Sequence, residues 1–83
     1  MLTTTNLKTL SERLRQERKA LGMTQLELAS RAGLRRETII KAEKGGNIDT
    51  LSLLAIISGL GKTLDLKEIG RPAYEDQKDL FDE

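Results

Sequence analysis

The residue types that could do chemistry cluster between residues 35 and 44, in the stretch RRETIIKAEK. On a helix of about 3.6 residues per turn, Ile39 and Ala42 fall on one face and the charged side chains fall on the other. An α-helix fits the major groove of B-DNA, where the side chains of its first turn reach the base edges. The cluster therefore predicts hydrogen bonding to a nucleic acid. The residues expected on its exposed face are Arg35, Arg36, Glu37, Ile40 and Lys41.

The composition argues against catalysis. The 83 residues include no histidine and no cysteine, so the chain lacks the commonest general base, the commonest metal ligand and any thiolate ligand. The stretch GLGKT at 59–63 is similar to the end of a P-loop, but that motif requires glycine at the position of Ile56. We therefore expect a binding protein that is not an enzyme and uses no metal or cofactor.

Charge is unevenly distributed along the chain. Residues 1–46 contain ten Lys/Arg and five Asp/Glu, whereas residues 47–83 contain four and eight. A basic N-terminal half favours contact with a polyanion, although ordinary surface solvation gives the same counts.

The sequence contains no targeting pattern and no apolar run of the ~20 residues that a membrane span requires. We expect a cytoplasmic, nucleoid-associated protein without membrane contact.

The first predicted helix covers residues 7–21, with Asn6 as its N-cap and Gly22 just beyond its end. Arg18 lies among the leucines of its apolar face. Because an unpaired buried charge is unfavourable, Arg18 must find a partner or extend out of the core to a phosphate. The leucines of this face are Leu7, Leu10, Leu14 and Leu21.

Two short helices, over residues 25–32 and 35–44, are expected to follow. Residues 24–27, TQLE, match the capping box that opens a helix. Gly33 ends the first of the two helices, because glycine adopts a positive φ at little cost. Ala29 is small where the two helices approach each other. The pattern predicts a helix-turn-helix.

A fourth helix is expected over residues 50–60, with Asp49 or Asn47 as its cap. Its leucines and isoleucines cover more than one face, so part of it needs a contact beyond the chain's own core. Residues 62–69 then alternate at the period of a β-strand. A lone strand leaves its backbone unpaired, so we expect it to pair with its copy in a homodimer; an irregular segment is the alternative. The expected dimer interface is Leu51, Leu54, Leu64, Leu66 and Ile69.

Residues 14–46, LRQERKALGMTQLELASRAGLRRETIIKAEKGG, resemble the Cro/CI-type (Xre) family of helix-turn-helix transcriptional regulators. The TQ-x-x-LA core, Gly33, Ile39 and Glu43 fall in the family's register. The later stretches LSLLAIISGLG and LGKTLDL are similar to HipB-like antitoxins. The resemblance implies an all-α, lambda-repressor-like fold of four to five short helices, with one C-terminal β-strand pairing across a dimer.

This resemblance also divides the chain into three parts. Residues 1–61 are expected to form the helix-turn-helix DNA-binding domain, 62–70 the dimerisation strand, and 71–83 a flexible acidic tail. The tail is either disordered and solubilising, or it folds against a protein partner. The tail residues expected to bind such a partner are Tyr74, Leu80 and Phe81.

The family's roles can be carried over by position. Arg35 and Arg36 would pair with guanine O6 and N7, and Glu37 would accept from cytosine N4. Ile40 would pack on thymine methyl groups and Lys41 would reach a base or a phosphate. Family members commonly have serine at the positions of Arg35 and Ile40, so the operator sequence stays open. The residues expected to contact phosphate are Thr24, Gln25, Thr38 and Lys44, and the expected structural ion pair is Arg18 with Glu43.

The function that the resemblance implies is repression of transcription from a palindromic double-stranded operator by a homodimer. A HipB-like protein would be the antitoxin of a type II toxin–antitoxin operon, which represses its own operon and binds a HipA-like kinase toxin. The alternative is a stand-alone Xre-type regulator of phage or metabolic genes without a toxin partner. A neighbouring gene for a kinase-like toxin would distinguish the two.

Overall fold

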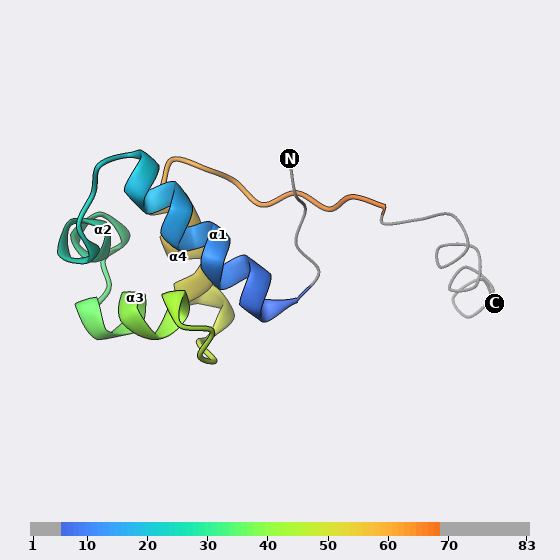
Figure 1. Cartoon of the computed structure of the whole chain (residues 1–83), viewed down its shortest axis with the longest axis horizontal. Helices are drawn as coiled ribbons and strands as arrows, with labels where there is room; N and C mark the ends of the chain where they lie inside the picture. The colour runs from blue at the N-terminus through green and yellow to red at the C-terminus, as the bar shows by residue number, and fades with distance from the viewer. Residues whose placement is uncertain (1–5, 69–83) are drawn as a thin grey trace.

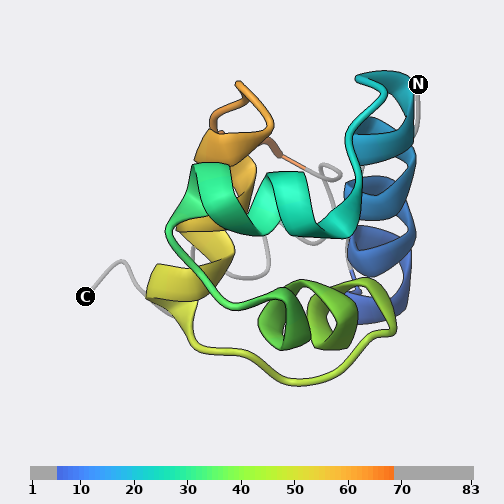
Figure 2. The ribbon, with the colours of Figure 1, turned by 90° about the vertical axis from the view of Figure 1, so that its left-hand side faces the viewer.

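The computed structural model describes residues 6–68, which form four helices. They are α1 (Leu7–Ala20), α2 (Gln25–Ala32), α3 (Arg36–Glu43) and α4 (Thr50–Gly59). Helix α2 packs against both α3 and α4, and α1 packs against α3 (Figure 1). In the view of Figure 2, α2 runs across the molecule above α3, and it lies between α1 and α4. The all-α prediction is confirmed, and each helix end lies within one residue of its expected position.

Local capping explains these helix ends. The Asn6 side chain accepts from the Thr9 N–H at 2.9 Å, and the Asp49 side chain accepts from the Ser52 N–H at 3.3 Å. Both acceptors satisfy backbone donors that have no partner inside the helix. Gly33 adopts φ 70°, the left-handed conformation expected of the residue that ends α2. Of the two expected caps for α4, Asp49 is the one used.

The core lies where the four helices meet. Leu28, Ile39 and Ile56 are its largest fully buried side chains, and each stabilises the fold by about 1.5–3 kcal/mol relative to exposure. Ala29 and Ala42 are buried as expected. The other buried apolar residues are Leu14, Met23, Ile57 and Leu60.

The apolar face of α1 is shorter than the sequence pattern indicates. Leu14 and Arg18 are buried and Leu10 packs partly against the core, but Leu7 is 46% exposed and Leu21 is 50% exposed. These two leucines lie at the two ends of α1, where its apolar face is left exposed. Periodicity identifies the face of a helix correctly but does not give the length over which neighbours cover it.

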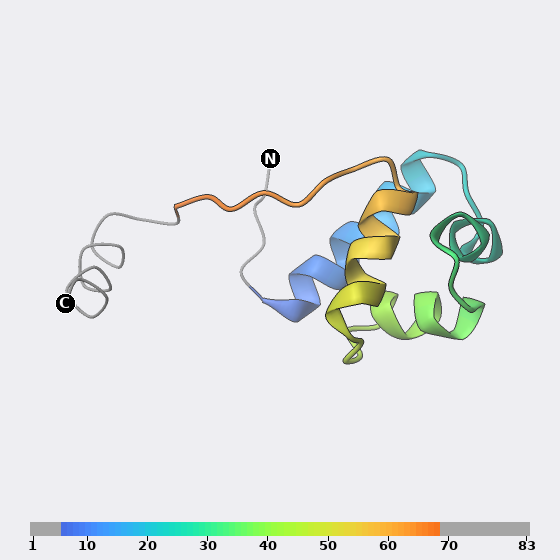
Figure 3. The same cartoon turned by 180° about the vertical axis from the view of Figure 1, so that it is seen from behind.

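Residues 62–68 leave the end of α4 as an extended segment that runs away from the helices (Figures 1 and 3). The segment is attached to the fold at its start, because the Lys62 N–H donates to the Ile57 carbonyl at 3.0 Å and Lys62 Nζ lies 3.6 Å from Glu17 Oε1. Arg13 Nε also donates to Glu17 at 2.7 Å, and this bond lowers the pKa of the Glu17 carboxyl.

The intersubunit strand stays a prediction, because a strand that pairs with its copy has no partner within one chain. Within residues 6–68 no strand is formed. Ile69 and the tail residues Tyr74, Leu80 and Phe81 lie outside the described residues, as does the boundary between the expected strand and tail. In the same described range, none of the helices has the length and apolarity needed to cross a membrane.

Candidate nucleic-acid interface

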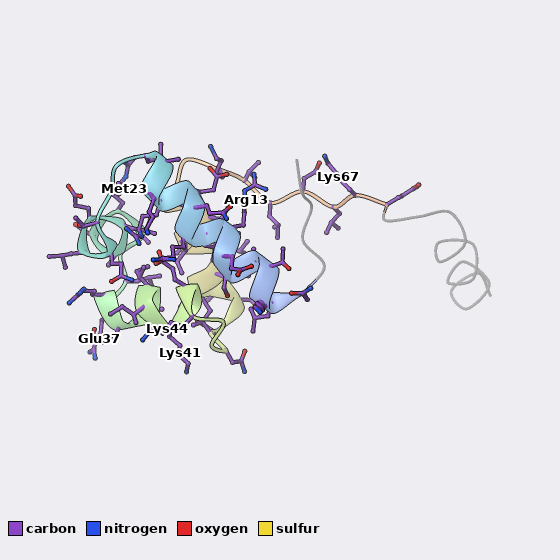
Figure 4. All side chains as sticks on the ribbon, in the orientation of Figure 1. Arg13, Met23, Glu37, Lys41, Lys44 and Lys67 are labelled. Atoms are coloured by element: carbon purple, nitrogen blue, oxygen red, sulfur yellow. The ribbon has the colours of Figure 1, made fainter. Side chains whose placement is uncertain are left out.

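Helix α3 presents its charged residues to solvent, apart from the buried Glu43 at its end. Arg35, Arg36, Glu37 and Lys41 are exposed, whereas Ile40 is half-buried. Figure 4 shows Glu37 and Lys41 projecting from the outer side of α3. Arg35 is the N-cap of α3, and its side chain makes no capping hydrogen bond, because a guanidinium group has no acceptor for the backbone N–H groups of the helix end. All five side chains expected to contact bases thus lie on or beside the outer face of one helix.

The N-terminus of α2 lies next to the start of α3. The Thr24 hydroxyl accepts from the Glu27 N–H at 3.0 Å, and the Thr24 N–H donates to the Glu27 carboxylate at 2.8 Å. This second bond lowers the pKa of Glu27. Because both Thr24 groups are used within the capping box, the N–H groups of Gln25 and Leu26 are the ones that point out of the helix end. Such a helix end favours an anion, through its free donors and its positive dipole.

A shallow hollow joins these two helix starts. Thr24, Gln25, Leu26 and Arg36 line it, with Arg18 at its base, and its volume is about 460 Å³. The structure therefore brings the residues expected to contact phosphate on α2 beside Arg36, the expected base-reading residue on α3. Leu26 is 63% exposed in the wall of this hollow, and the sequence pattern carries no signal for this exposure.

The ion pair expected between Arg18 and Glu43 is present and buried. Arg18 Nε lies 2.7 Å from Glu43 Oε2, and Nη2 lies 3.2 Å from Oε1, so the guanidinium group and the carboxylate meet in a two-point contact. Arg18 Nη1 also donates to the Met23 carbonyl at 2.8 Å. The two residues are 8% and 9% exposed. Since Arg18 is on α1 and Glu43 on α3, this pair fixes the two helices relative to each other.

Gln25 extends this network to α2. Its side-chain Nε2 donates to Glu43 Oε1 at 3.2 Å, which leaves the amide oxygen of Gln25 outside this bond. The sequence predicts a phosphate contact for Gln25, and no pattern in it indicates this bond to Glu43. As a result, the N-terminus of α2 is connected to the end of α3 by a side chain that itself belongs to the candidate interface.

The other two residues expected to contact phosphate lie on α3 and at its end. Thr38 is half-buried and lines a polar hollow of about 340 Å³, together with Asp49 and Ser52 at the start of α4. Lys44 is the C-cap of α3 and is exposed. The structure thus divides the four expected phosphate contacts between the start of α2 and the two ends of α3.

Gly46 lies in the loop after α3, close to Lys41. We expect Gly46→Ala to destabilise the contact between this loop and α3. An added Cβ would lie 2.5 Å from Lys41 Cγ and 3.0 Å from the Lys41 carbonyl oxygen. The side chain has room to move, but the carbonyl belongs to α3 and accepts from the Gly46 N–H at 2.9 Å. We expect a loss of about 1–3 kcal/mol in the free energy of unfolding, as for other overpacked sites. Urea unfolding measures it, and an unchanged midpoint would contradict the close contact.

Ser11 on α1 is a further buried residue that was not predicted. It is 2% exposed and lines a cavity between α1 and the end of α3, although serine is usually found at the surface. A signal was available, because Ser11 precedes the buried Leu14 by three residues and the buried Arg18 by seven, which places all three on one helical face.

The geometry defines a class of protein: a short helix and a glycine turn place a charged second helix on the surface, beside a free helix N-terminus, as in DNA-binding domains with a helix-turn-helix. Residues 14–67 match the family model described as Helix-turn-helix, HTH_3. An uncharacterised HTH-type transcriptional regulator from Methanothermobacter thermautotrophicus is 41% identical over 63 residues, which are 76% of this chain and 80% of the relative. The chain belongs to this Xre-type helix-turn-helix family of DNA-binding transcriptional regulators.

Solved structures with the same fold include two kinds of regulator. The restriction-modification controller protein C.AhdI from Aeromonas hydrophila is 32% identical, with a TM-score of 0.64 over 68% of this chain and 86% of that one. HipB in complex with an O2 20mer is 22% identical, with a TM-score of 0.78 over 84% of this chain and 99% of that one. HipB in a complex with HipA and O2–O3 gives the same TM-score of 0.78. The lambda-repressor-like arrangement of helices is thereby confirmed, and the likeness to HipB is a likeness of fold.

Proposed function

We propose that the protein is a sequence-specific repressor that binds a palindromic operator as a homodimer, with α3 of each subunit in the major groove. The observation that carries the proposal is the exposure of Arg36, Glu37 and Lys41 beside the free N-terminus of α2. A base-reading surface and an anion-binding helix end then meet one DNA duplex together. Arg35 and Ile40 complete the proposed base contacts. The proposed phosphate contacts are Thr24, Gln25, Thr38 and Lys44.

Selection of binding sites from a random duplex library tests this proposal. We expect the enriched sequences to contain inverted repeats, with half-site centres separated by about 10–10.5 base pairs or a multiple of that spacing. Arg36→Ala, carried through the same selection, should enrich weaker sites with a relaxed preference at one position of each half-site. Enrichment of unrelated sequences without a repeat would contradict specific binding by a dimer.

The proposed dimer buries apolar side chains that one chain leaves exposed. Leu51 on α4 is 77% exposed and Leu54 is 42% exposed, and on the extended segment Leu64 is 56% and Leu66 is 91% exposed. Figure 3 shows α4 and the departing segment from the side opposite α1. A second copy of the chain would cover the leucines of α4 and those of the extended segment together, because the same residues of each copy meet across a twofold axis. Ile69 is proposed to extend this interface.

Leu54→Asp is expected to raise the dimer dissociation constant by about 100-fold or more, because a twofold interface loses two buried leucines and gains two charges. Sedimentation equilibrium measures the change. Leu21→Asp is the matched control, since Leu21 is 50% exposed at the end of α1 and lies outside the proposed interface. If the two variants dimerise equally well, the proposed interface is wrong.

We further propose that the protein is a HipB-like antitoxin that represses its own operon and binds a HipA-like kinase toxin. The proposal is supported by the fold shared with HipB, which has been solved together with HipA. The proposed toxin-binding residues are Tyr74, Leu80 and Phe81 in the acidic C-terminal stretch.

Truncation tests the role of this stretch. A chain of residues 1–70 retains the DNA-binding helices and the proposed strand, so it is expected to bind DNA like the full chain but to lose capture of the toxin encoded beside it. Equal capture of the toxin by the full and the shortened chains would remove the role of the tail.

A stand-alone regulator is the second candidate function. The observation that favours it is the 32% identity to C.AhdI, a restriction-modification controller protein. Such a protein would regulate neighbouring genes, for example phage or metabolic genes, without a toxin partner. The identity of the adjacent gene distinguishes the two candidates, because only the antitoxin requires a gene for a kinase-like toxin.

A further inference from the structure

The cavity between α1 and the end of α3 contains a buried hydroxyl group without a partner. The Oγ of Ser11 has no hydrogen-bond partner among the described residues, although the residue is 98% buried. Gly45 lies opposite, and a Cβ added to it would be 3.9 Å from this oxygen. The cavity has a volume of about 520 Å³. Because buried polar groups are almost always hydrogen-bonded to protein, water or a ligand, this hydroxyl is a donor open to a bound ligand or to an ordered water.

The charges around this cavity are mostly positive. Glu43 is already paired with Arg18, so Glu12 is the remaining acid of the cavity wall. None of the four basic residues of the wall forms an ion pair within residues 6–68. Four cations in the wall of one cavity, beside a buried donor, favour a compact anion with several oxygen atoms. These basic residues are Lys8, Arg15, Lys19 and Lys44.

We propose that this cavity binds a phosphate group. The Ser11 hydroxyl donates to one phosphate oxygen, and the guanidinium group of Arg15 offers two parallel donors to others. Gly45 keeps the wall facing Ser11 free of a side chain. The site contains none of the proposed base-contacting residues, and Lys44 is the one proposed phosphate-contacting residue that also lines it. The phosphate belongs either to a small molecule or to a DNA backbone, and the two arms of the experiment distinguish these sources.

The first arm uses inorganic phosphate and the full-length protein without DNA. Thermal unfolding is followed in sodium phosphate and in sodium chloride of equal ionic strength. A phosphate concentration of about five times Kd should raise the Tm of the unchanged protein by roughly 4–8 °C, since a ligand of the folded state stabilises it by RT ln(1 + [L]/Kd). Ser11→Ala should lower the phosphate affinity by about tenfold or more, the effect of losing a hydrogen bond to a charged group.

Two further variants sharpen the first arm. Arg15→Gln changes an exposed side chain, so it preserves the fold even if Ser11→Ala does not, and it should also reduce the phosphate response. Lys67→Gln removes one positive charge from the extended segment, outside the residues that line the cavity, and should keep the full response. This control separates binding in the cavity from the general effect of phosphate on a basic protein.

The second arm measures the affinity for a DNA duplex of arbitrary sequence. If the cavity takes a backbone phosphate, Ser11→Ala and Arg15→Gln both weaken this affinity, and Arg15→Gln lowers the slope of log K against log salt by about 1. If the cavity binds the phosphate group of a small molecule, Ser11→Ala and Arg15→Gln bind DNA with unchanged affinity, and both lose the rise in Tm caused by inorganic phosphate. An unchanged phosphate response together with an unchanged DNA affinity in both variants would overturn the proposal.

Discussion

Replacing Glu43 by leucine is expected to lower the free energy of unfolding by about 3–5 kcal/mol, because it leaves the buried guanidinium group of Arg18 without its carboxylate. The side chains of the two residues are only 10% and 4% exposed, so water cannot replace the lost partner. Gln25 loses its acceptor at the same time. Since small domains are stable by about 5–15 kcal/mol in total, much of the protein should be unfolded at moderate temperature. Urea unfolding followed by circular dichroism measures the change.

Two further variants isolate the ion pair as the cause. The double variant Arg18→Met, Glu43→Leu removes both charges and is expected to recover most of the loss, since apolar residues of similar size replace a buried pair without penalty. Glu17→Leu breaks the more exposed pair with Arg13 on the surface of α1 and should have a far smaller effect. If Glu43→Leu and Glu17→Leu are equally stable, the buried pair does not hold α1 and α3 together.

The second large effect is expected for Arg36→Ala, which removes two arginine–guanine contacts from each dimer and should weaken binding to the selected operator by roughly 30-fold to 10⁴-fold. A two-point contact between arginine and guanine contributes roughly 1–3 kcal/mol of discrimination between bases. Binding to DNA of unrelated sequence depends on phosphate contacts, so it should change little. Competition titrations with operator and unrelated duplexes give both affinities for one protein preparation.

Two variants serve as controls for Arg36→Ala: one removes a proposed phosphate contact, and the other removes a positive charge elsewhere in the chain. Gln25→Ala removes a proposed phosphate contact and should weaken both affinities by a similar factor, and its stability must be measured because Gln25 also contacts Glu43. Lys67→Gln removes a positive charge from the extended segment and should leave the ratio of the two affinities unchanged. If Arg36→Ala lowers both affinities equally, Arg36 contacts the backbone and does not read a base.

The helices could be predicted from the sequence because their ends depend on local chemistry. Asn6 and Asp49 accept from donors three residues later, and Gly33 supplies a positive φ, so each signal lies within a few residues of the end that it sets. The start of α3 has no side-chain cap, yet its position follows from the glycine turn before it. The inward positions of Ile39 and Ala42 follow in the same way from helical spacing.

The contacts that could not be predicted join residues far apart in the chain. Gln25 meets Glu43 only because α2 crosses the end of α3, which no local pattern encodes. Likewise, Ser11 is buried because α1 and the loop at Gly45 close on each other. The Arg18–Glu43 pair was foreseen by combining family resemblance with the rule that a charge on an apolar face needs a partner.

We propose that two short helices joined at Gly33 place α3 in the major groove while the start of α2 binds the DNA backbone. The most direct test is the affinity for the selected operator, measured by fluorescence anisotropy at increasing salt. With six to ten phosphate contacts, the affinity is expected to fall by ~10³–10⁵ between 50 and 200 mM salt, linearly in a plot of log K against log salt. An affinity that does not change over this range would contradict the account.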